Sequence, residues 1–156
     1  MRWDLLDRFE VLRRGDLARA SKSFSGREDF FKDHLPARPL VPEVLFIEMI
    51  AQAGGVLYGL GFDFKKEVIL AKVNQSRFFR PVAPPCAFLV EARVADEKEE
   101  GAMITGVVRE GGTPVAEAEI LLVTMDSLDG GVGKRIVFSE HFLKEFDIYG
   151  VAGARP

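Results

Sequence analysis

The sequence predicts an α+β fold in which a curved antiparallel sheet wraps around one long central helix. The stretch from Val44 to Leu60 is apolar at nearly every position, as is typical of a helix buried on all sides. About six stretches with strand character flank it, in the order strands, helix, strands. Charged or glycine-containing turns separate the last strands, which is typical of an antiparallel meander.

The length of the chain favours a single domain. A chain of 156 residues is long enough to bury one full hydrophobic core. We expect the sheet and its helix to occupy residues 1–125, and a linker with a C-terminal helical tail to occupy residues 126–156. The net charge of −3 indicates neither a nucleic-acid footprint nor a polybasic membrane surface, so we expect no nucleic acid and no membrane insertion.

The cysteine content and the hydropathy pattern indicate where in the cell the protein is expected. Cys86 is the only cysteine, which excludes an intramolecular disulfide and leaves too few thiolates for a structural zinc cluster. We therefore expect no metal, and Cys86 to pack as a small apolar residue. Residues 1–14 contain acidic side chains and no continuous apolar run, unlike a secretory signal. Glu48 and Gln52 interrupt the longest apolar run, which favours core burial. These observations predict a cytoplasmic protein.

The first elements are short. Trp3, Leu6 and Phe9 have helical spacing, so residues 3–9 are expected to form an amphipathic helix. The sequence FEVLRR, a Gly-Asp pair and LARASKSF then predict a strand, a turn and a second strand over residues 9–24. A polar loop follows.

Three prolines stiffen the segment before the helix. Pro36, Pro39 and Pro42 each fix φ and bias the preceding residue toward extended backbone. Residues 34–41 are therefore expected to form a rigid, extended lead-in. Pro42 suits the first helical position, so the helix is expected to start there.

The strands after the helix differ in character. Residues 67–73, EVILAKV, are mostly apolar and β-branched, which predicts a strand buried on nearly both faces that continues into RFFRPV. Residues 87–95, 102–109 and 114–125 are three further strand candidates, and Gly111-Gly112 marks the last turn.

The C-terminal tail has its own pattern. Residues 126–133, DSLDGGVG, are expected to be a linker, and residues 139–150 a short helix capped by Ser139 and stopped by Gly150. Aromatic side chains would share one side of this helix. We expect the tail to dock on its own domain or on a neighbour; a lid over a pocket is the alternative.

A single sheet cannot easily enclose a helix that is apolar all round. Burial of the remaining face by a second subunit follows naturally, so we predict a homodimer or a multiple of it.

The polar residues of the helix suggest chemistry. Glu48 and Gln52 are four residues apart and lie on one helix face. Because burial disfavours a charged carboxyl group, Glu48 is expected to serve as a general acid. His34 precedes this helix as a candidate base, and the N–H groups of Glu43 and Val44 are candidates for an oxyanion site. Together these groups suit proton abstraction α to a carbonyl, followed by loss of a β-hydroxyl as water.

The same stretch resembles a known family. Residues 34–52 read HLPARPLVPEVLFIEMIAQ, which is similar without gaps to the motif HFPxxPxxPGxLxxE(or D)xxxQ of the FabZ-type and FabA-type 3-hydroxyacyl-(acyl-carrier-protein) dehydratases of the hot-dog fold. LLDRFEV, RFFRPV and AEAEILLV extend the resemblance over roughly residues 4–125. The chain departs from the pattern at Glu43, where the family has glycine, at Leu35, at Asp33 before the histidine, and at Pro85-Cys86.

The resemblance implies a two-subunit active site. His34 of one chain would remove the C2 proton of a 3-hydroxyacyl thioester, and Glu48 of the other would protonate or position the departing hydroxyl. The thioester carbonyl would accept from the N–H of Glu43 or Val44, Gln52 would support Glu48, and an apolar tunnel would hold the acyl chain.

The resemblance also implies partners. The substrate would be carried on the 4′-phosphopantetheine of acyl carrier protein, without a further cofactor, by a homodimer or a trimer of dimers. Arg77 and Arg80 would contact the carrier protein or its pantetheine arm, although strand-edge solubilising charges are the alternative. An acyl-thioesterase on the same fold, and a non-catalytic homologue that binds acyl chains or carrier protein, remain alternative functions.

Overall fold

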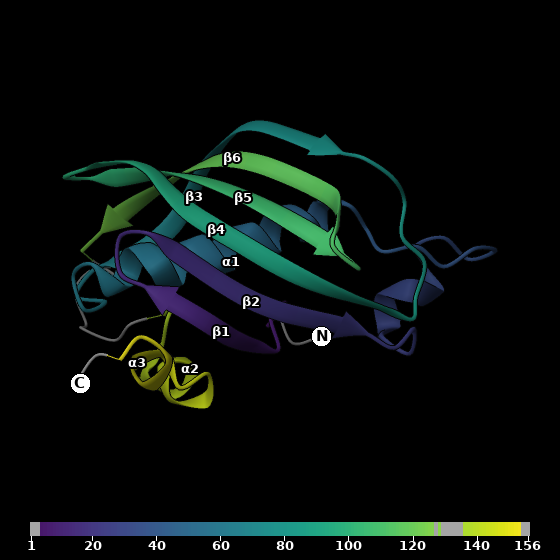
Figure 1. Ribbon diagram of the computed structural model, residues 1–156, viewed down its shortest axis with the longest axis horizontal. Coiled ribbons are helices and arrows are strands. Elements are labelled where there is room, and N and C mark those ends of the chain that lie inside the picture. The colour runs from purple at the N-terminus through teal and green to yellow at the C-terminus, as the bar shows by residue number, and fades with distance from the viewer. Residues whose placement is uncertain (1–3, 127, 129–135, 154–156) are drawn as a thin grey trace.

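The computed structural model describes residues 4–126, 128 and 136–153. Its six strands form one antiparallel sheet in the order β1-β2-β4-β5-β6-β3, which curves around the long helix α1 (Figure 1). The predicted α+β architecture is confirmed. The strands are β1 (Arg8–Arg13), β2 (Leu17–Phe24), β3 (Glu67–Phe78), β4 (Cys86–Lys98), β5 (Gly101–Glu110) and β6 (Thr113–Met125).

Short turns connect the neighbouring strands. Gly15, with φ of 72°, lies in the β1–β2 turn, and Gly111 and Gly112, with φ of 55° and 84°, form the β5–β6 turn. Two successive residues with positive φ match the twist of a two-residue hairpin, and glycine adopts that backbone without strain. The predicted meander over β4, β5 and β6 is confirmed.

The N-terminal helix prediction is wrong over the described residues. Residues 4–7 are not helical, and Arg8 already begins β1. The N–H of Asp7 donates to the carbonyl of Ser21 at 2.7 Å, and Arg8 is paired with Ser21 in the ladder. Pairing with β2 satisfies this backbone, so the tertiary partner overrides a three-residue helical spacing.

Strand β3 lies at the end of the sheet. It pairs with β6, and its other edge has no strand partner among residues that the structure describes. Beyond Val68 the strand is partly or fully exposed, including Leu70 and Val73, each 38% exposed. The prediction of burial on both faces is therefore wrong, because an apolar, β-branched composition does not distinguish an edge strand from a central one.

Helix α1 (Val44–Leu60) is buried along most of its length. Thirteen of its 17 residues are buried, and the sheet packs against it closely. A Cβ added to Gly54 would lie 2.6 Å from the Cγ2 of Ile104, so glycine is needed for this approach of β5. The four residues that are not buried recur at helical spacing and form one strip on the first half of the helix: Val44, Ile47, Glu48 and Gln52.

The C-terminal tail forms two short helices where one was expected. α2 (Glu140–Glu145) is capped by Ser139, whose hydroxyl accepts from the N–H of Phe142 at 3.2 Å, and α3 (Ile148–Val151) follows. Asp147 adopts left-handed backbone with φ of 46°, which ends the first helix before Gly150. Most of the predicted linker lies outside the described residues.

The tail packs on the sheet-and-helix body near β1 (Figure 1). Phe146 packs edge-to-face on Phe9, with ring centroids 6.0 Å apart, and Tyr149 packs on Phe64, with ring centroids 6.3 Å apart. Buried tail residues thereby join the same hydrophobic core as α1. No helix in the described part of the chain is long and apolar enough to cross a membrane.

Candidate active site

His34 is held in a closed loop after the short 3-10 helix η1 (Asp29–Lys32). Its N–H donates to the carbonyl of Phe30 at 3.0 Å, and its carbonyl accepts from the N–H of Leu40 at 3.0 Å. The segment thus folds back on itself, and the predicted extended lead-in is wrong. Proline fixes φ at its own position, but it does not prevent a turn between prolines.

The histidine ring has a defined tautomer. Its Nδ1 lies 3.1 Å from the carbonyl oxygen of Leu40. A carbonyl oxygen can only accept, so Nδ1 carries the proton of the neutral ring. Nε2 is then left with a lone pair and can act as a base. The His34 residue as a whole is partly buried within one chain.

Helix α1 begins at Val44, two residues later than predicted. Leu45 and Phe46 donate their N–H groups to the carbonyls of Pro42 and Glu43 at 3.0 and 3.1 Å. The N–H groups of Glu43 and Val44 have no hydrogen-bond acceptor within the described residues. Free N–H groups at the first turn carry the positive end of the helix dipole, which favours a developing negative charge.

Glu48 is part of a hydrogen-bonded chain. The Nε2 of Gln52 donates to the Oε1 of Glu48 at 3.0 Å, and the Oε1 of Gln52 accepts from the N–H of Leu5 at 3.0 Å. Because Leu5 donates to the amide oxygen, the amide nitrogen must face Glu48. The pair predicted from i, i+4 spacing therefore meets, and the N-terminal segment orients it.

A pocket of about 350 Å³ opens beside Glu48. One face of α1, the start of β3 and the tail line it, and most of its wall is apolar. Glu48 is only partly buried there within one chain. An apolar pocket with few polar groups is typical of a small-molecule site. Its lining residues are Asp4, Glu48, Ala51, Gln52, Gly55, Val68, Ile69, Leu70, Leu122, Val137, Phe138 and Phe142.

His34 and Glu48 do not meet within one chain. His34 does not line the pocket, and no hydrogen bond or ion pair of the described residues joins the two side chains. Val44, by contrast, lies one helical turn before Glu48 on the same face. One chain therefore carries the carboxyl group and the free N–H groups about one helical turn apart, and His34, Glu43 and Val44 all lie outside the pocket lining.

Arg77 and Arg80 lie at the end of β3 and just after it. Arg77 pairs with Glu117 at 3.5 Å and lies over the ring of Phe79 at 6.0 Å, and Arg80 pairs with Glu110 at 2.6 Å. Both side chains are substantially exposed. Exposed pairs contribute little to stability, so these arginines remain available to other partners.

Glu67 is a structural anchor that was not predicted from the sequence. Its side chain is buried, with 4% exposure, and its carboxylate accepts from the N–H groups of Ile136 and Val137 at 2.6 and 3.1 Å. A buried carboxylate needs such donors. The available signal was an acidic residue at the start of an otherwise apolar strand, but the distant donors are not readable from the sequence.

Cys86 is buried. Burial raises the pKa of its thiol to about 11, with a further contribution from the negative charge of Glu110. The thiol is therefore protonated at neutral pH and unsuited to nucleophilic attack.

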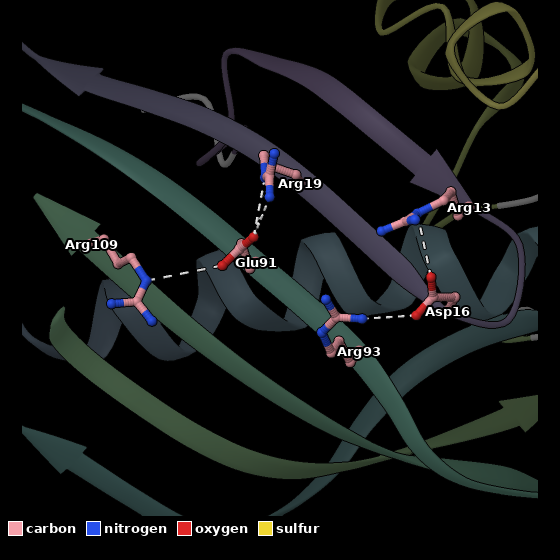
Figure 2. A network of polar contacts seen from close by, with 6 residues as sticks. All are labelled: Arg13, Asp16, Arg19, Glu91, Arg93 and Arg109. Atoms are coloured by element: carbon pink, nitrogen blue, oxygen red, sulfur yellow. Dashed lines mark hydrogen bonds and ion pairs between the residues drawn. The ribbon is translucent and has the colours of Figure 1, made fainter. Parts of the chain in front are cut away.

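A charged network covers the outer face of the sheet (Figure 2). Glu91 pairs with Arg19 at 2.7 Å and with Arg109 at 3.9 Å, and Asp16 pairs with Arg93 and Arg13 at 2.8 and 3.3 Å. Their neighbours along β2, β4 and β5 point inward to α1, so these charges face away from the helix and the pocket. They form a solvated face and add nothing to the candidate site.

Most of the chain is similar in sequence to known proteins. A family model described as a FabA-like domain matches residues 2–119. A 3-hydroxyacyl-[acyl-carrier-protein] dehydratase FabZ from Acidovorax sp. (strain JS42) is 35% identical over 124 residues, which covers 75% of this chain and 83% of that protein.

Solved structures share the fold. An uncharacterized protein from Pyrococcus horikoshii has a TM-score of 0.64 at 15% identity, over 79% of this chain and 85% of its own. A mutant hypothetical thioesterase from Streptococcus pneumoniae TIGR4 has a TM-score of 0.58 at 7% identity, over 76% of this chain and 90% of its own. At such identities the likeness shows the fold alone. The predicted hot-dog fold is confirmed.

Proposed function

Because this chain belongs to the FabZ-type 3-hydroxyacyl-[acyl-carrier-protein] dehydratase family, we propose that it removes water from a 3-hydroxyacyl thioester on acyl carrier protein. The product is the trans-2-enoyl thioester. The observation that carries the proposal is the arrangement on one face of α1. Glu48, oriented by Gln52 on the wall of an apolar pocket, lies one turn from the free N–H groups of Glu43 and Val44.

The base is His34. Its Nδ1–H donates to Leu40, which leaves the Nε2 lone pair to remove the C2 proton of the substrate. The electron pair of the C2–H bond moves toward the thioester carbonyl, whose oxygen gains negative charge. The N–H groups of Glu43 and Val44 stabilise that oxygen, as donors at a helix N-terminus can. These N–H groups belong to the backbone, so glutamate in place of glycine at position 43 does not remove them.

The acid is Glu48. As the C2–C3 double bond forms, the C3–O bond breaks, and the departing oxygen takes the Glu48 proton and leaves as water. The proton on His34 then returns to Glu48 before the next turnover. Proton transfers and backbone donors are sufficient for this reaction, so we propose no cofactor beyond the 4′-phosphopantetheine that carries the acyl group.

A second subunit completes the site. Within one chain His34 does not line the pocket, and α1 leaves an open strip that includes Glu48. The outer edge of β3, which has no strand partner among the described residues and carries exposed Leu70 and Val73, is a template for pairing with a second copy. We propose a homodimer, alone or as a trimer of dimers, in which His34 of one chain faces Glu48 of the other.

The carrier protein docks near the end of β3 in this proposal. Arg77 and Arg80 are exposed there, and arginine binds phosphate and carboxylate groups through its planar fork. Acyl carrier protein and its pantetheine phosphate are the proposed partners of these two residues. We place the enzyme in the cytoplasm.

The direct test is turnover of 3-hydroxyacyl carrier proteins, followed as formation of the 2-enoyl thioester and as its hydration in reverse. His34→Ala and Glu48→Gln should each lower kcat/KM by about 10² to 10⁴, the usual contribution of general acid–base catalysis. Glu99→Gln, at an exposed turn outside the pocket, is the matched control and should leave the rate unchanged.

Three other outcomes contradict the proposal. Absence of both dehydration and hydration by the wild-type protein would exclude it. Release of free thiol from an acyl thioester, dependent on Glu48, would instead indicate a thioesterase. Turnover that appears only in a Glu43→Gly variant would indicate that the natural protein binds acyl groups without this reaction.

A further inference from the structure

The pocket beside Glu48 has a wall that comes from the C-terminal tail. Val137, Phe138 and Phe142 line it together with α1 and β3. Building on the dehydratase function proposed above, we propose that residues 136–142 close the end of the acyl pocket, and that Phe138 limits the length of the acyl chain that the enzyme accepts.

The direction of the pocket follows from the helix residues that line it. Glu48, Ala51, Gln52 and Gly55 lie on one face of α1, at i, i+3, i+4 and i+7. At 1.5 Å per residue, the distance along the axis from Glu48 to Gly55 is about 10 Å. Glu48 marks the catalytic end, so a chain bound along this face extends toward Gly55.

Phe138 lies at that far end. A Cβ added to Gly55 would be 2.8 Å from the Cζ of Phe138, so the ring packs directly on the glycine backbone. Phe138 is only 7% exposed, and it contacts Phe64 and Phe142 with ring centroids 5.8 and 5.3 Å away. An acyl chain that reached past Gly55 would meet this ring.

Glu67 forms hydrogen bonds with the backbone immediately before Phe138. Its buried carboxylate accepts from the N–H groups of Ile136 and Val137. Hydrogen bonds to a charged group are the stronger kind, and this pair fixes both residues that lead into the ring. The position of Phe138 is therefore set from two sides, by the carboxylate before it and by the aromatic contacts around it.

The segment lies outside the part of the chain that matches the family. The FabA-like match ends at residue 119, whereas the tail residues that line the pocket begin at Val137. The volume of about 350 Å³ is at the lower end of the range of about 300 to 1,000 Å³ for ligand pockets. Both observations favour an acyl-length limit that this chain sets with its own tail, and short or medium acyl groups as its preferred substrates.

The experiment compares acyl lengths in wild-type protein, Phe138→Ala and Phe138→Leu. We would measure kcat/KM for 3-hydroxy-butyryl, octanoyl, dodecanoyl and hexadecanoyl carrier proteins. Removing the ring should raise the ratio of long-chain to short-chain kcat/KM by about tenfold, the gain from burying one to two more methylene groups. Phe138→Leu keeps the core filled and should shift the ratio in the same direction by less.

Phe146→Ala is the matched control. Phe146 is also a buried aromatic of the tail and contacts Phe9 and Phe142, but it does not line the pocket. It should leave the length profile unchanged. An equal shift in Phe146→Ala would overturn the role of Phe138, as would an unchanged profile in both Phe138 variants of an active enzyme.

A binding measurement tests the length limit independently of the proposed reaction. Calorimetry with butyryl- and dodecanoyl-pantetheine amides reports acyl length without turnover. If the wild-type protein turns over no 3-hydroxyacyl thioester, the proposed reaction fails. A Phe138→Ala variant that gains affinity for the dodecanoyl amide alone would still support the length limit, and one that gains none would overturn it.

Discussion

The two halves of helix α1 differ in how completely they are buried. All residues from Ala53 to Leu60 are buried, beneath the sheet and the chain's own tail. The first half keeps an open strip that holds Glu48 and Gln52. One chain thus closes the half without reactive groups and leaves the half with them uncovered. In the proposed dimer, the tail would cover the second half of the helix and the second subunit the first half.

Side-chain chemistry explains the division. The second half carries glycines on which Ile104 and Phe138 pack, so apolar contacts cover it at no polar cost. The first half carries a carboxyl group and an amide, and covering them requires partners for their polar atoms. Leu5 and Gln52 satisfy part of this need within one chain. The remaining face suits a partner that brings its own polar group, such as His34.

The largest effect is expected from hybrid dimers, which test whether a second subunit completes the site on the first half of α1. Neither His34→Ala nor Glu48→Gln should be active alone. A hybrid dimer of the two variants contains one site with both residues intact if the site is shared, so it should recover about half of the wild-type activity. Co-expression with two affinity tags and a turnover assay on the purified hybrid provide the measurement.

The wild-type homodimer carrying the same two tags is the reference for this experiment. A hybrid that stays as inactive as its parents would place both residues of each site in one chain. That result would refute the division of α1 between the tail and a second subunit.

An intermediate effect is expected at Gln52. Gln52→Leu removes the donor to Glu48 and keeps the side-chain volume similar. Because Glu48 is protonated in the proposed mechanism, this hydrogen bond joins neutral groups and is worth about 0.5 to 1.5 kcal/mol, so kcat should fall by about 2- to 10-fold with little change in KM. Steady-state kinetics show the split between kcat and KM, and thermal unfolding shows whether the fold is kept. A rise in KM at constant kcat would contradict a positioning role.

The smallest effect is expected at Glu67, which binds the tail that covers the second half of α1. Glu67→Ala removes the acceptor of two backbone N–H groups and should destabilise the protein by about 2 to 3 kcal/mol. For a chain of this size that corresponds to a decrease in Tm of about 4 to 12 °C. Glu117→Ala, which removes only an exposed pair with Arg77, should cost at most about 1 kcal/mol. Equal decreases in Tm would show that Glu67 does not anchor the tail.

Local patterns were the reliable part of the prediction from sequence. The apolar run predicted the position of α1, although its start was expected two residues too early, and the Gly111-Gly112 pair predicted the last hairpin. The four-residue spacing of Glu48 and Gln52 also predicted a contact that the structure contains. In each case the interacting groups are neighbours along the chain, so geometry within one element determines the outcome.

Predictions failed where a distant segment decides the structure. Residues 3–9 had helical spacing, but β2 pairs with Arg8 and Phe9 and accepts from the N–H of Asp7. Strand β3 had the composition of a buried strand, but its place at the end of the sheet leaves it exposed. The bond between Glu67 and Ile136 spans 69 residues, and no local signal predicts its partner.

The sequence alone determined that a buried helix would carry one polar pair and that a histidine and free amides would precede it. Spacing along a single helix is enough for that, because the backbone geometry is the same in every helix. Only the tertiary structure decided which part of α1 stays open and which part the tail covers. Those outcomes depend on contacts between segments far apart in the chain, whose relative positions exist only after folding.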